Sequence, residues 1–222
     1  MELRQIQVSG SLEDIARIGV VFLKDLKNGG SPEGLRQRIA SVASELHQAI
    51  GRRPLSELDS VKRTRSLYHR LGLDPTRERP SSERLLRRVV QGRPLPQVSS
   101  LVDLVNLASL LHQFPMGAYD WDKVAPPVLV RIGRPDESYV GIKGEVVALE
   151  GKIALVDGEG PFGSPSQDSP RALTSAGTVR AAVILGASAD SSKTSLDDAL
   201  KEVIALAREF CEARVGEWGI LG

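Results

Sequence analysis

The most chemically suggestive part of the chain is a glycine-rich segment, Gly158-Glu-Gly-Pro-Phe-Gly163, which follows an apparent strand at Ile153–Asp157. Its spacing fits the G-x-G-x-x-G pattern of dinucleotide-binding sites, in which the last glycine enters a helix whose N-terminus faces the pyrophosphate. Here Ser164-Pro-Ser166 and Pro170 follow, and they prevent a regular helix. The sequence therefore argues against a dinucleotide site and indicates a sharply bent binding loop whose backbone a ligand can approach closely.

Other catalytic patterns are incomplete. Leu185-Gly-Ala-Ser188 is placed like a nucleophile elbow, but Asp190 stands where that motif needs its second glycine. Zinc and thiolate chemistry lack ligands, since Cys211 is the single cysteine and no two histidines have H-x-x-x-H spacing. All three histidines fall in helix-like segments, where packing or solvent exposure is the usual role: His47, His69 and His112. We expect no metal and no cofactor, and Cys211 to be a buried small hydrophobe.

Charge is unevenly distributed along the chain. Residues 1–97 hold 18 Lys+Arg and 11 Asp+Glu, whereas residues 98–222 hold 11 and 17, so the halves carry +7 and −6. Taken alone, an arginine run more often forms solvated helix faces that pair with acidic residues, although it also fits attraction of a polyanion. The densest part of the run comprises Arg63, Arg65, Arg70, Arg77, Arg79, Arg84, Arg87, Arg88 and Arg93.

Apolar spacing predicts the elements that position these residues. A short strand at Val20–Leu23 is followed by helices at Ser31–Ile50, Leu58–Leu71, Ser81–Val90 and Leu101–Leu111. Short β-branched runs then predict strands at Val128–Ile132, Tyr139–Ile142, Glu145–Leu149, Ile153–Asp157 and Val179–Leu185, before a last helix from Ser195. In the third helix, Arg84, Arg87 and Arg88 share an exposed face opposite Leu85, Leu86, Val89 and Val90. The sequence predicts an α+β fold with a mixed or antiparallel sheet.

Composition excludes several classes of protein. Hydrophobic residues make up 41% and charged residues 26%, as in globular proteins, and no interdomain linker is evident, so we expect one domain over residues 1–222. Aromatic residues are only 4%, which leaves few rings for stacking on bases. No stretch approaches the roughly 20 apolar residues of a membrane span, and the N-terminus has acids where a signal peptide has bases. These features predict a cytoplasmic protein with no membrane partner.

Four segments in order resemble a known family. They are Arg79–Arg88, Pro94–Pro96 with Leu101–Asn106, Pro115–Asp120 and Asp157–Thr178. The pattern is similar to freestanding relatives of the tRNA-editing (B3/4) domain of the phenylalanyl-tRNA synthetase beta subunit, over about residues 55–215, with residues 1–54 as an N-terminal strand and helix. The resemblance implies a sheet packed between helices. It also implies an aminoacyl-tRNA deacylase, since that domain hydrolyses tyrosine wrongly esterified to the phenylalanine tRNA.

The resemblance also implies which residues form the site. Asn106 matches a family asparagine of the editing pocket, where its amide holds the ester carbonyl or a water; alternatively it braces the helix backbone. Gly117 stands where the synthetase has a histidine, and no acid occurs in Thr178–Ala187, where the synthetase has a glutamate. Two polar groups of the synthetase pocket are thus missing, and a non-catalytic module that binds tRNA or an amino acid is the alternative function.

The remaining candidates lie in and after the glycine segment. Main-chain N–H groups of Gly160 to Gly163 are candidates to stabilise an oxyanion, which makes Gly160 and Gly163, with Asn106, the candidate catalytic positions. Phe162 belongs to the same segment. Asp168, Ser169 and Thr174 are candidates for contacts with the amino group and a water, or for turn hydrogen bonds. Arg84, Arg87 and Arg88 are candidates to bind phosphates of aminoacylated tRNA, the expected partner.

Overall fold

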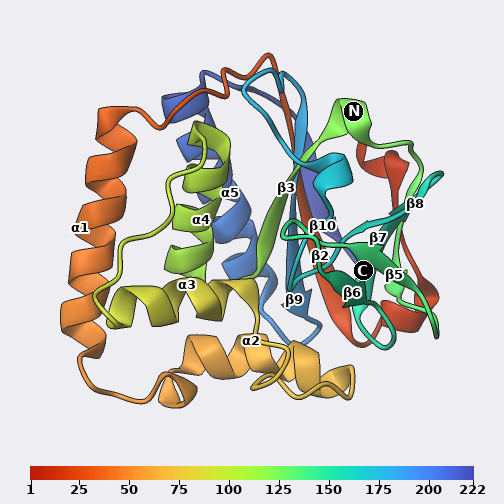
Figure 1. Ribbon diagram of the computed structural model, residues 1–222, viewed down its shortest axis with the longest axis horizontal. Coiled ribbons are helices and arrows are strands. Elements are labelled where there is room, and N and C mark those ends of the chain that lie inside the picture. The colour runs from red at the N-terminus through yellow and green to blue at the C-terminus, as the bar shows by residue number, and fades with distance from the viewer.

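A four-stranded antiparallel sheet divides the molecule into two layers of different kinds. In the computed structural model, which describes residues 1–222, its strands lie in the order β10-β2-β9-β3. Helices cover one face of this sheet and a second sheet covers the other (Figure 1). The strands of the central sheet are β2 (Ala16–Lys24), β3 (Met116–Asp120), β9 (Ala181–Ser188) and β10 (Arg214–Leu221).

Strands β2 and β9 form the middle of the molecule because both of their faces are apolar. Every residue of β9 is buried, and six consecutive residues of β2, Ile18 to Leu23, are buried as well. The two strands pair over eight residues, with Val20 opposite Ile184. Continuous aliphatic runs of this kind are stable only when both faces of a sheet are covered. Strands β3 and β10 are the two edges of the sheet.

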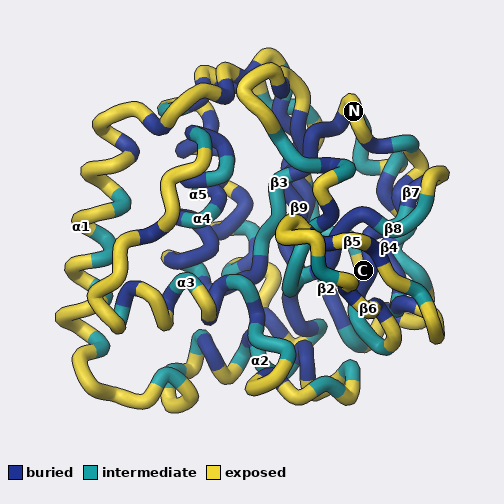
Figure 2. Tube along the Cα trace, viewed as in Figure 1, coloured by how far each residue is buried: buried dark blue, intermediate teal, exposed yellow.

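The helical layer consists of five helices. They are α1 (Glu33–Ile50), α2 (Asp59–Arg70), α3 (Ser81–Val90), α4 (Ser100–His112) and α5 (Lys193–Cys211). Helices α4 and α5 pack on the sheet, and α4 is buried on almost every side. Helix α1 lies outermost and is largely exposed (Figure 2). Its one fully buried residue is Leu35.

The second layer is a mixed sheet with a projecting hairpin. Its strands, in the order β1-β4-β7-β8, are β1 (Ile6–Val8), β4 (Val128–Ile132), β7 (Ile153–Asp157) and β8 (Gly160–Gly163). Strands β1 and β4 are parallel, and the other pairs are antiparallel. The hairpin consists of β5 (Ser138–Val140) and β6 (Val146–Ala148). Side chains of both sheets fill the space between them and form the second core of the protein.

The α+β fold with mixed and antiparallel sheets is confirmed, and the predicted helices occur within a few residues of their expected ends. The sequence also predicts Ser31 and Ser195 as N-cap residues of the first and last helices, and both predictions are wrong. Ser31 does not cap α1, because its hydroxyl donates to the buried Asp103 carboxylate instead. Ser192, three residues before the expected Ser195, caps α5 by accepting from the Ser195 amide. Cys211 is buried, as expected. None of the helices is long and apolar enough to cross a membrane.

Four strands were not predicted from the sequence. They are β1, β3, β8 and β10, and each is short, glycine-containing or at a sheet edge. Strand β8 is the glycine segment itself, so the expected binding loop is a strand that pairs with β7. Proline and glycine in Gly160–Gly163 hide the strand pattern, because both residues are normally depleted in strands.

Helix α4 provides a test of this core. Leu104 is fully buried, whereas Leu111, a second leucine of the same helix, is 40% exposed. Leu104→Ala removes three buried carbon atoms and leaves a cavity, so we expect it to lower the free energy of unfolding by about 2–5 kcal/mol. Leu111→Ala on the same helix is the matched control, with an expected change within about 0.5 kcal/mol. Urea unfolding measures both, and equal effects would contradict the burial described here.

Candidate functional site

A small cavity lies between the two sheets beside the edge strand β3. Its walls come from β2, β3, β7, β9 and the turn after β8, and include Ile18, Gly117, Tyr119, Ile153, Ser164 and Gly186. Its interior volume is about 20 Å³. A volume of this size holds about one water molecule and is too small for an amino-acid side chain.

The principal polar contact at this cavity joins Tyr119 to Asp168. The Tyr119 hydroxyl donates to the Asp168 carboxylate at 2.6 Å. Loss of hydration raises the pKa of Asp168 to about 6, although the hydrogen bond from Tyr119 acts in the opposite direction. Burial, followed by the nearby Asp168 charge, raises the pKa of Tyr119 well above its usual value. Tyr119 is therefore a hydrogen-bond donor throughout the physiological pH range, and Asp168 carries no ion-paired cation.

Gly117 and Gly163 hold the Tyr119 ring between them. A Cβ atom on Gly163 would lie 2.7 Å from the Tyr119 hydroxyl oxygen, and one on Gly117 would lie 2.7 Å from the ring carbon Cζ. Neither distance is tolerated by ordinary packing, so any larger residue at either position displaces the ring. The two glycines come from different sheets, β3 and β8, and the tyrosine is fixed where these sheets approach each other.

A second tyrosine extends the polar network around the turn after β8. The Tyr139 hydroxyl lies 3.1 Å from the Ser164 hydroxyl and donates to the Gln167 carbonyl at 2.6 Å. The Gln167 amide donates to Glu145 at 3.0 Å, and the other Glu145 carboxylate oxygen is buried without a partner. The β5–β6 hairpin thus holds the turn Ser164–Gln167, which contributes to the cavity wall.

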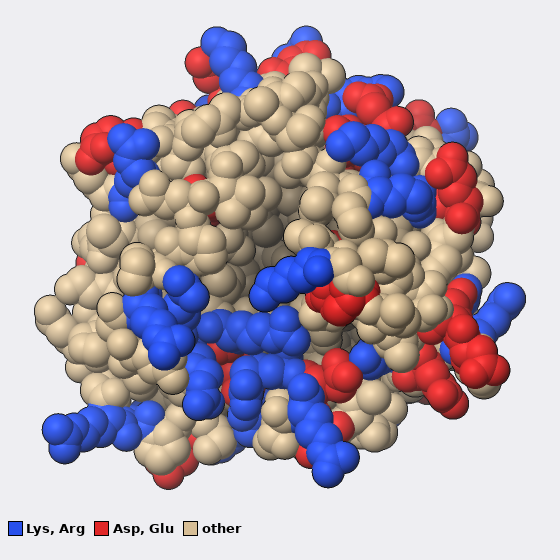
Figure 3. All heavy atoms as spheres, viewed as in Figure 1, with Lys and Arg blue, Asp and Glu red and all other residues tan.

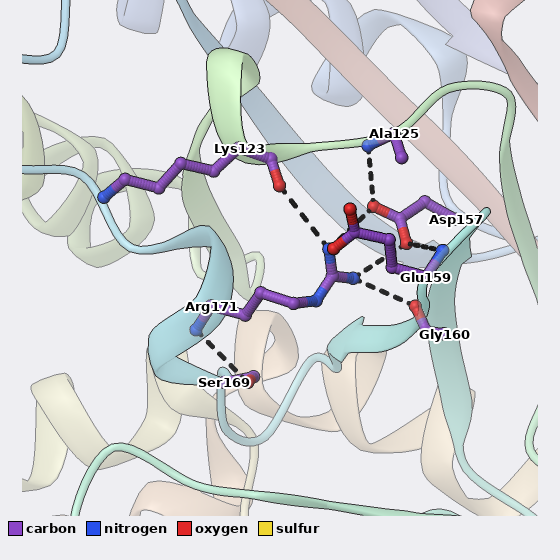
Figure 4. A network of polar contacts seen from close by, with 7 residues as sticks. All are labelled: Lys123, Ala125, Asp157, Glu159, Gly160, Ser169 and Arg171. Atoms are coloured by element: carbon purple, nitrogen blue, oxygen red, sulfur yellow. Dashed lines mark hydrogen bonds and ion pairs between the residues drawn. The ribbon is translucent and has the colours of Figure 1, made fainter.

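The β7–β8 hairpin is fixed from its other end by Arg171 (Figure 4). Its guanidinium forms an ion pair with the buried Asp157 at 2.8 Å, donates to the Gly160 carbonyl at 3.0 Å, and lies 5.2 Å from the centre of the Phe162 ring. Burial alone would raise the pKa of Asp157, but hydrogen bonds from Arg171 and from the amides of Ala125 and Glu159 outweigh it and lower the pKa. The network positions the strand that carries Gly163.

Basic side chains gather on the surface over α2 and α3, below a hollow in the molecule that lies over β3 (Figure 3). An open depression there is lined mainly by arginines: Arg79, Arg84, Arg87, Arg88 and Arg93, with Leu85, Gln91 and Pro96. Arg79 is paired with Glu83 at 3.3 Å, as is Arg65 at 2.7 Å. Arg84, Arg87 and Arg88 are exposed, as predicted, and none of them forms an ion pair. Pairing with the acidic half of the chain therefore does not account for these three arginines.

The structure brings together only some of the predicted site residues. Gly117 lines the cavity, and Gly163 and Asp168 contact Tyr119. Asn106 is half-buried on α4, which packs beside β3; it is outside the cavity lining, and its amide makes no hydrogen bond in the protein. The alternative in which Asn106 braces the backbone is therefore not what the structure shows.

The other candidates have structural roles or lie apart from the cavity. Phe162 is fully buried against the Tyr119 ring, at a centroid distance of 5.3 Å, because it faces the core between the sheets. Ser169 accepts from the Arg171 amide, and its own amide donates to the Phe162 carbonyl at 2.9 Å, which is the turn role. The Gly160 carbonyl is used by Arg171, and Thr174 is half-buried without a side-chain hydrogen bond.

Tyr119 is the residue that sequence reasoning missed. It lies within the segment Pro115–Asp120, but nothing in the sequence marks its hydroxyl as functional, since tyrosine is common in buried cores. The available signal was the alternation in β3: Gly117 and Tyr119 lie on the same face of a strand. Recognising that face required β3 to be identified as a strand.

Comparisons with known proteins agree with this fold. Residues 63–166, nearly half of the chain, match the family model of the B3/4 domain. The structure is similar to a crystal structure of an N-terminal fragment of the phenylalanyl-tRNA synthetase beta-subunit from Pyrococcus horikoshii, with 15% sequence identity and a TM-score of 0.50. The match covers 95% of this chain and 50% of that fragment, so the chain spans half the fragment's length. No curated protein matches the chain in sequence.

These findings confirm the resemblance to the B3/4 domain expected from the sequence. The family match applies to residues 63–166, which include most of α2, all of α3 and α4, and β3 to β8. At 15% identity, the structural match shows a shared fold and nothing finer.

The position of Tyr119 yields a test of the cavity geometry. Gly163→Ala places a Cβ against the hydroxyl, so we expect it to destabilise the protein by about 1–3 kcal/mol. Adding Tyr119→Phe removes the nearest atom and should recover part of that loss. Gly30→Ala, where the new Cβ meets nothing within 4 Å, is the control. Urea unfolding of the unmodified protein, the two single variants, the double variant and the control measures the coupling. Additive effects of Gly163→Ala and Tyr119→Phe would contradict the contact.

Asp168 makes stability depend on pH in a defined direction. Because its pKa is raised to about 6 in the folded protein, the folded state binds more protons than the unfolded state between the two values. The Asp168 contribution therefore favours folding at low pH and is lost as pH rises from about 4 to about 6. We expect Asp168→Asn to remove this dependence when unfolding is measured from pH 4 to 7.5. If the free energies of unfolding of the two proteins differed by the same amount at every pH, the assignment would be contradicted.

Proposed function

We propose that this chain, which shares the B3/4 fold, binds aminoacylated tRNA and hydrolyses the ester of a mischarged tRNA. The observation that carries the proposal is the proximity of two features. The Tyr119–Asp168 cavity and the unpaired arginines of α3 are joined by the turn Ser164–Gln167, since Arg84 donates to the Ser166 carbonyl at 3.2 Å. An ester on a polyanionic carrier needs both polar groups beside a cavity and a basic surface.

We propose that the Asp168 carboxylate accepts a hydrogen bond from a positively charged or proton-donating group of the substrate. At neutral pH, which is above its pKa of about 6, the carboxylate is charged and lacks a cationic partner. A free α-ammonium group, or a water molecule held in the cavity, supplies the missing donor. Tyr119 fixes the orientation of the carboxylate while its own proton stays in place, because its pKa is raised by burial.

The ester carbonyl requires a separate hydrogen-bond donor. Asn106 is proposed for this role, because its half-buried amide makes no hydrogen bond in the protein. A positioned donor to a developing oxyanion is worth about 3 kcal/mol of barrier. The main chain of β8 is a weaker candidate than the sequence indicated, since Gly163 pairs with Leu155 on one side and bridges to Asp168 on the other.

A non-catalytic module is the second candidate function. It is favoured by the cavity volume of about 20 Å³, which leaves room for water but not for a side chain of the substrate. In this alternative the same arginines bind tRNA, and the aminoacyl group lies in the hollow over β3 without being hydrolysed (Figure 3).

Deacylation of a panel of mischarged tRNAs separates the two functions. We expect the purified protein to shorten the lifetime of at least one member of the panel, because in the proposed mechanism Asp168 holds a water and Asn106 the ester carbonyl. Asp168→Asn and Asn106→Ala should each lower the rate by about a hundredfold or more. Asp14→Asn, at an exposed aspartate without an ion pair, is the control and should leave the rate unchanged.

The outcomes are distinct. Unchanged lifetimes across the whole panel, with tRNA still bound, would contradict the hydrolase and support the module. Absence of both hydrolysis and tRNA binding would contradict the proposed function in either form.

A further inference from the structure

The arginine depression concentrates positive charge that the protein itself leaves uncompensated. Four of its five arginines form no ion pair: Arg84, Arg87, Arg88 and Arg93. Other arginines in the same half of the chain are neutralised by carboxylates: Glu83 pairs with Arg65 and with Arg79, the fifth arginine of the depression, and Asp190 pairs with Arg70. Guanidinium groups gathered in one concave surface repel each other, and a bound anion removes that repulsion.

The geometry of the depression suits a chain of phosphates. Arg84 and Arg88 are four residues apart on α3, which is about 6 Å along the helix axis, and Arg87 lies on the same face. Arg93 comes from the loop that follows. Arg88 is also oriented by its own hydrogen bond to the Pro94 carbonyl at 2.5 Å. Guanidinium groups spread over such a distance can contact successive phosphates.

No aromatic side chain lines the depression. Single-stranded nucleic acids are usually held by stacking of bases on aromatic rings in addition to charge. The depression offers charge alone, together with the Leu85 side chain and the Gln91 amide. Contacts to phosphates fix position without reading sequence, so a ligand bound here is recognised independently of its bases.

Arg84 connects the depression to the candidate site. Its guanidinium donates to the Ser166 carbonyl, and the Ser166 hydroxyl lies 3.2 Å from the buried Tyr68 hydroxyl. Ser164 and Pro165, the two residues before Ser166, line the cavity beside Tyr119. The depression therefore ends one or two residues of chain away from the candidate site.

We propose that the depression binds consecutive phosphates of the single-stranded 3′ end of an RNA, directly 5′ of the nucleotide whose ribose carries the ester. This inference rests on the proposed function and specifies the part of the tRNA that is held. A single strand fits because its terminal nucleotide can leave the stack and enter the hollow over β3, whereas a paired terminus is tied to its complement. Recognition is by charge, without base preference.

The test uses 3′-aminoacylated oligonucleotides in which an amide replaces the ester, so that nothing is hydrolysed. A series from one to five nucleotides is compared with the intact charged tRNA, and dissociation constants are measured by fluorescence anisotropy at several salt concentrations. We expect affinity to rise with each of the first phosphates added and then to level off. The slope of log K against log salt should steepen by about 0.7 for each phosphate contacted.

Single arginine variants show which residues cause the dependence of affinity on length and on salt. Arg87→Gln and Arg88→Gln should each remove one step of the length dependence and about 0.7 of the salt slope. Arg208→Gln, at an exposed arginine of α5 that forms no ion pair, is the matched control and should change neither. Replacing every base by uracil should leave the affinities within about threefold, because the depression reads no bases.

Each outcome decides the inference. Binding of charged tRNA with no gain across the short series, a gain that appears only with paired RNA, or equal loss in Arg208→Gln and Arg88→Gln would overturn it while leaving the proposed function intact. Failure of both the oligonucleotides and the charged tRNA to bind would overturn the proposed function and this inference with it.

Discussion

The hydrogen bond from Tyr119 to Asp168 is the contact on which the candidate site depends. It crosses between the two sheets, because Tyr119 belongs to β3 and Asp168 follows β8. Its geometry requires glycine at both 117 and 163, and the Arg171–Asp157 pair fixes the strand that carries the second of these. Burying a carboxylate without a cation raises its pKa and leaves a site that favours a positively charged or proton-donating ligand.

Charge outside the cavity complements this arrangement. The acidic residues of the chain neutralise many of its arginines, but those on the exposed face of α3 are left free next to the cavity wall. Exposed arginines contribute little to folding through isolated ion pairs, so leaving them unpaired costs the protein little stability. The same groups remain available to a polyanion, which connects the basic half of the sequence to the Tyr119–Asp168 contact beside the cavity.

The sequence predicted the helices, the fold class and the exposed arginines, because periodic apolar residues determine all three. It did not predict β8, since Pro161 and two glycines conceal the strand, and it could not place Asn106, whose position depends on how α4 packs beside β3. Phe162 was assigned to the pocket from its neighbours in sequence, but alternation along β8 directs it into the core. Residues that act through close contact between distant strands, such as Tyr119, become visible only when the strands are paired.

The most direct test of the account compares one tRNA in its charged and uncharged forms, using a stable amide linkage for the charged form. The buried Asp168 carboxylate and the arginine face are claimed to act on the same ligand. The charged tRNA should therefore bind more tightly than the uncharged one, and Asp168→Asn should abolish that difference without changing the affinity for uncharged tRNA. Equal affinities of the unmodified protein for the two forms would contradict the claim.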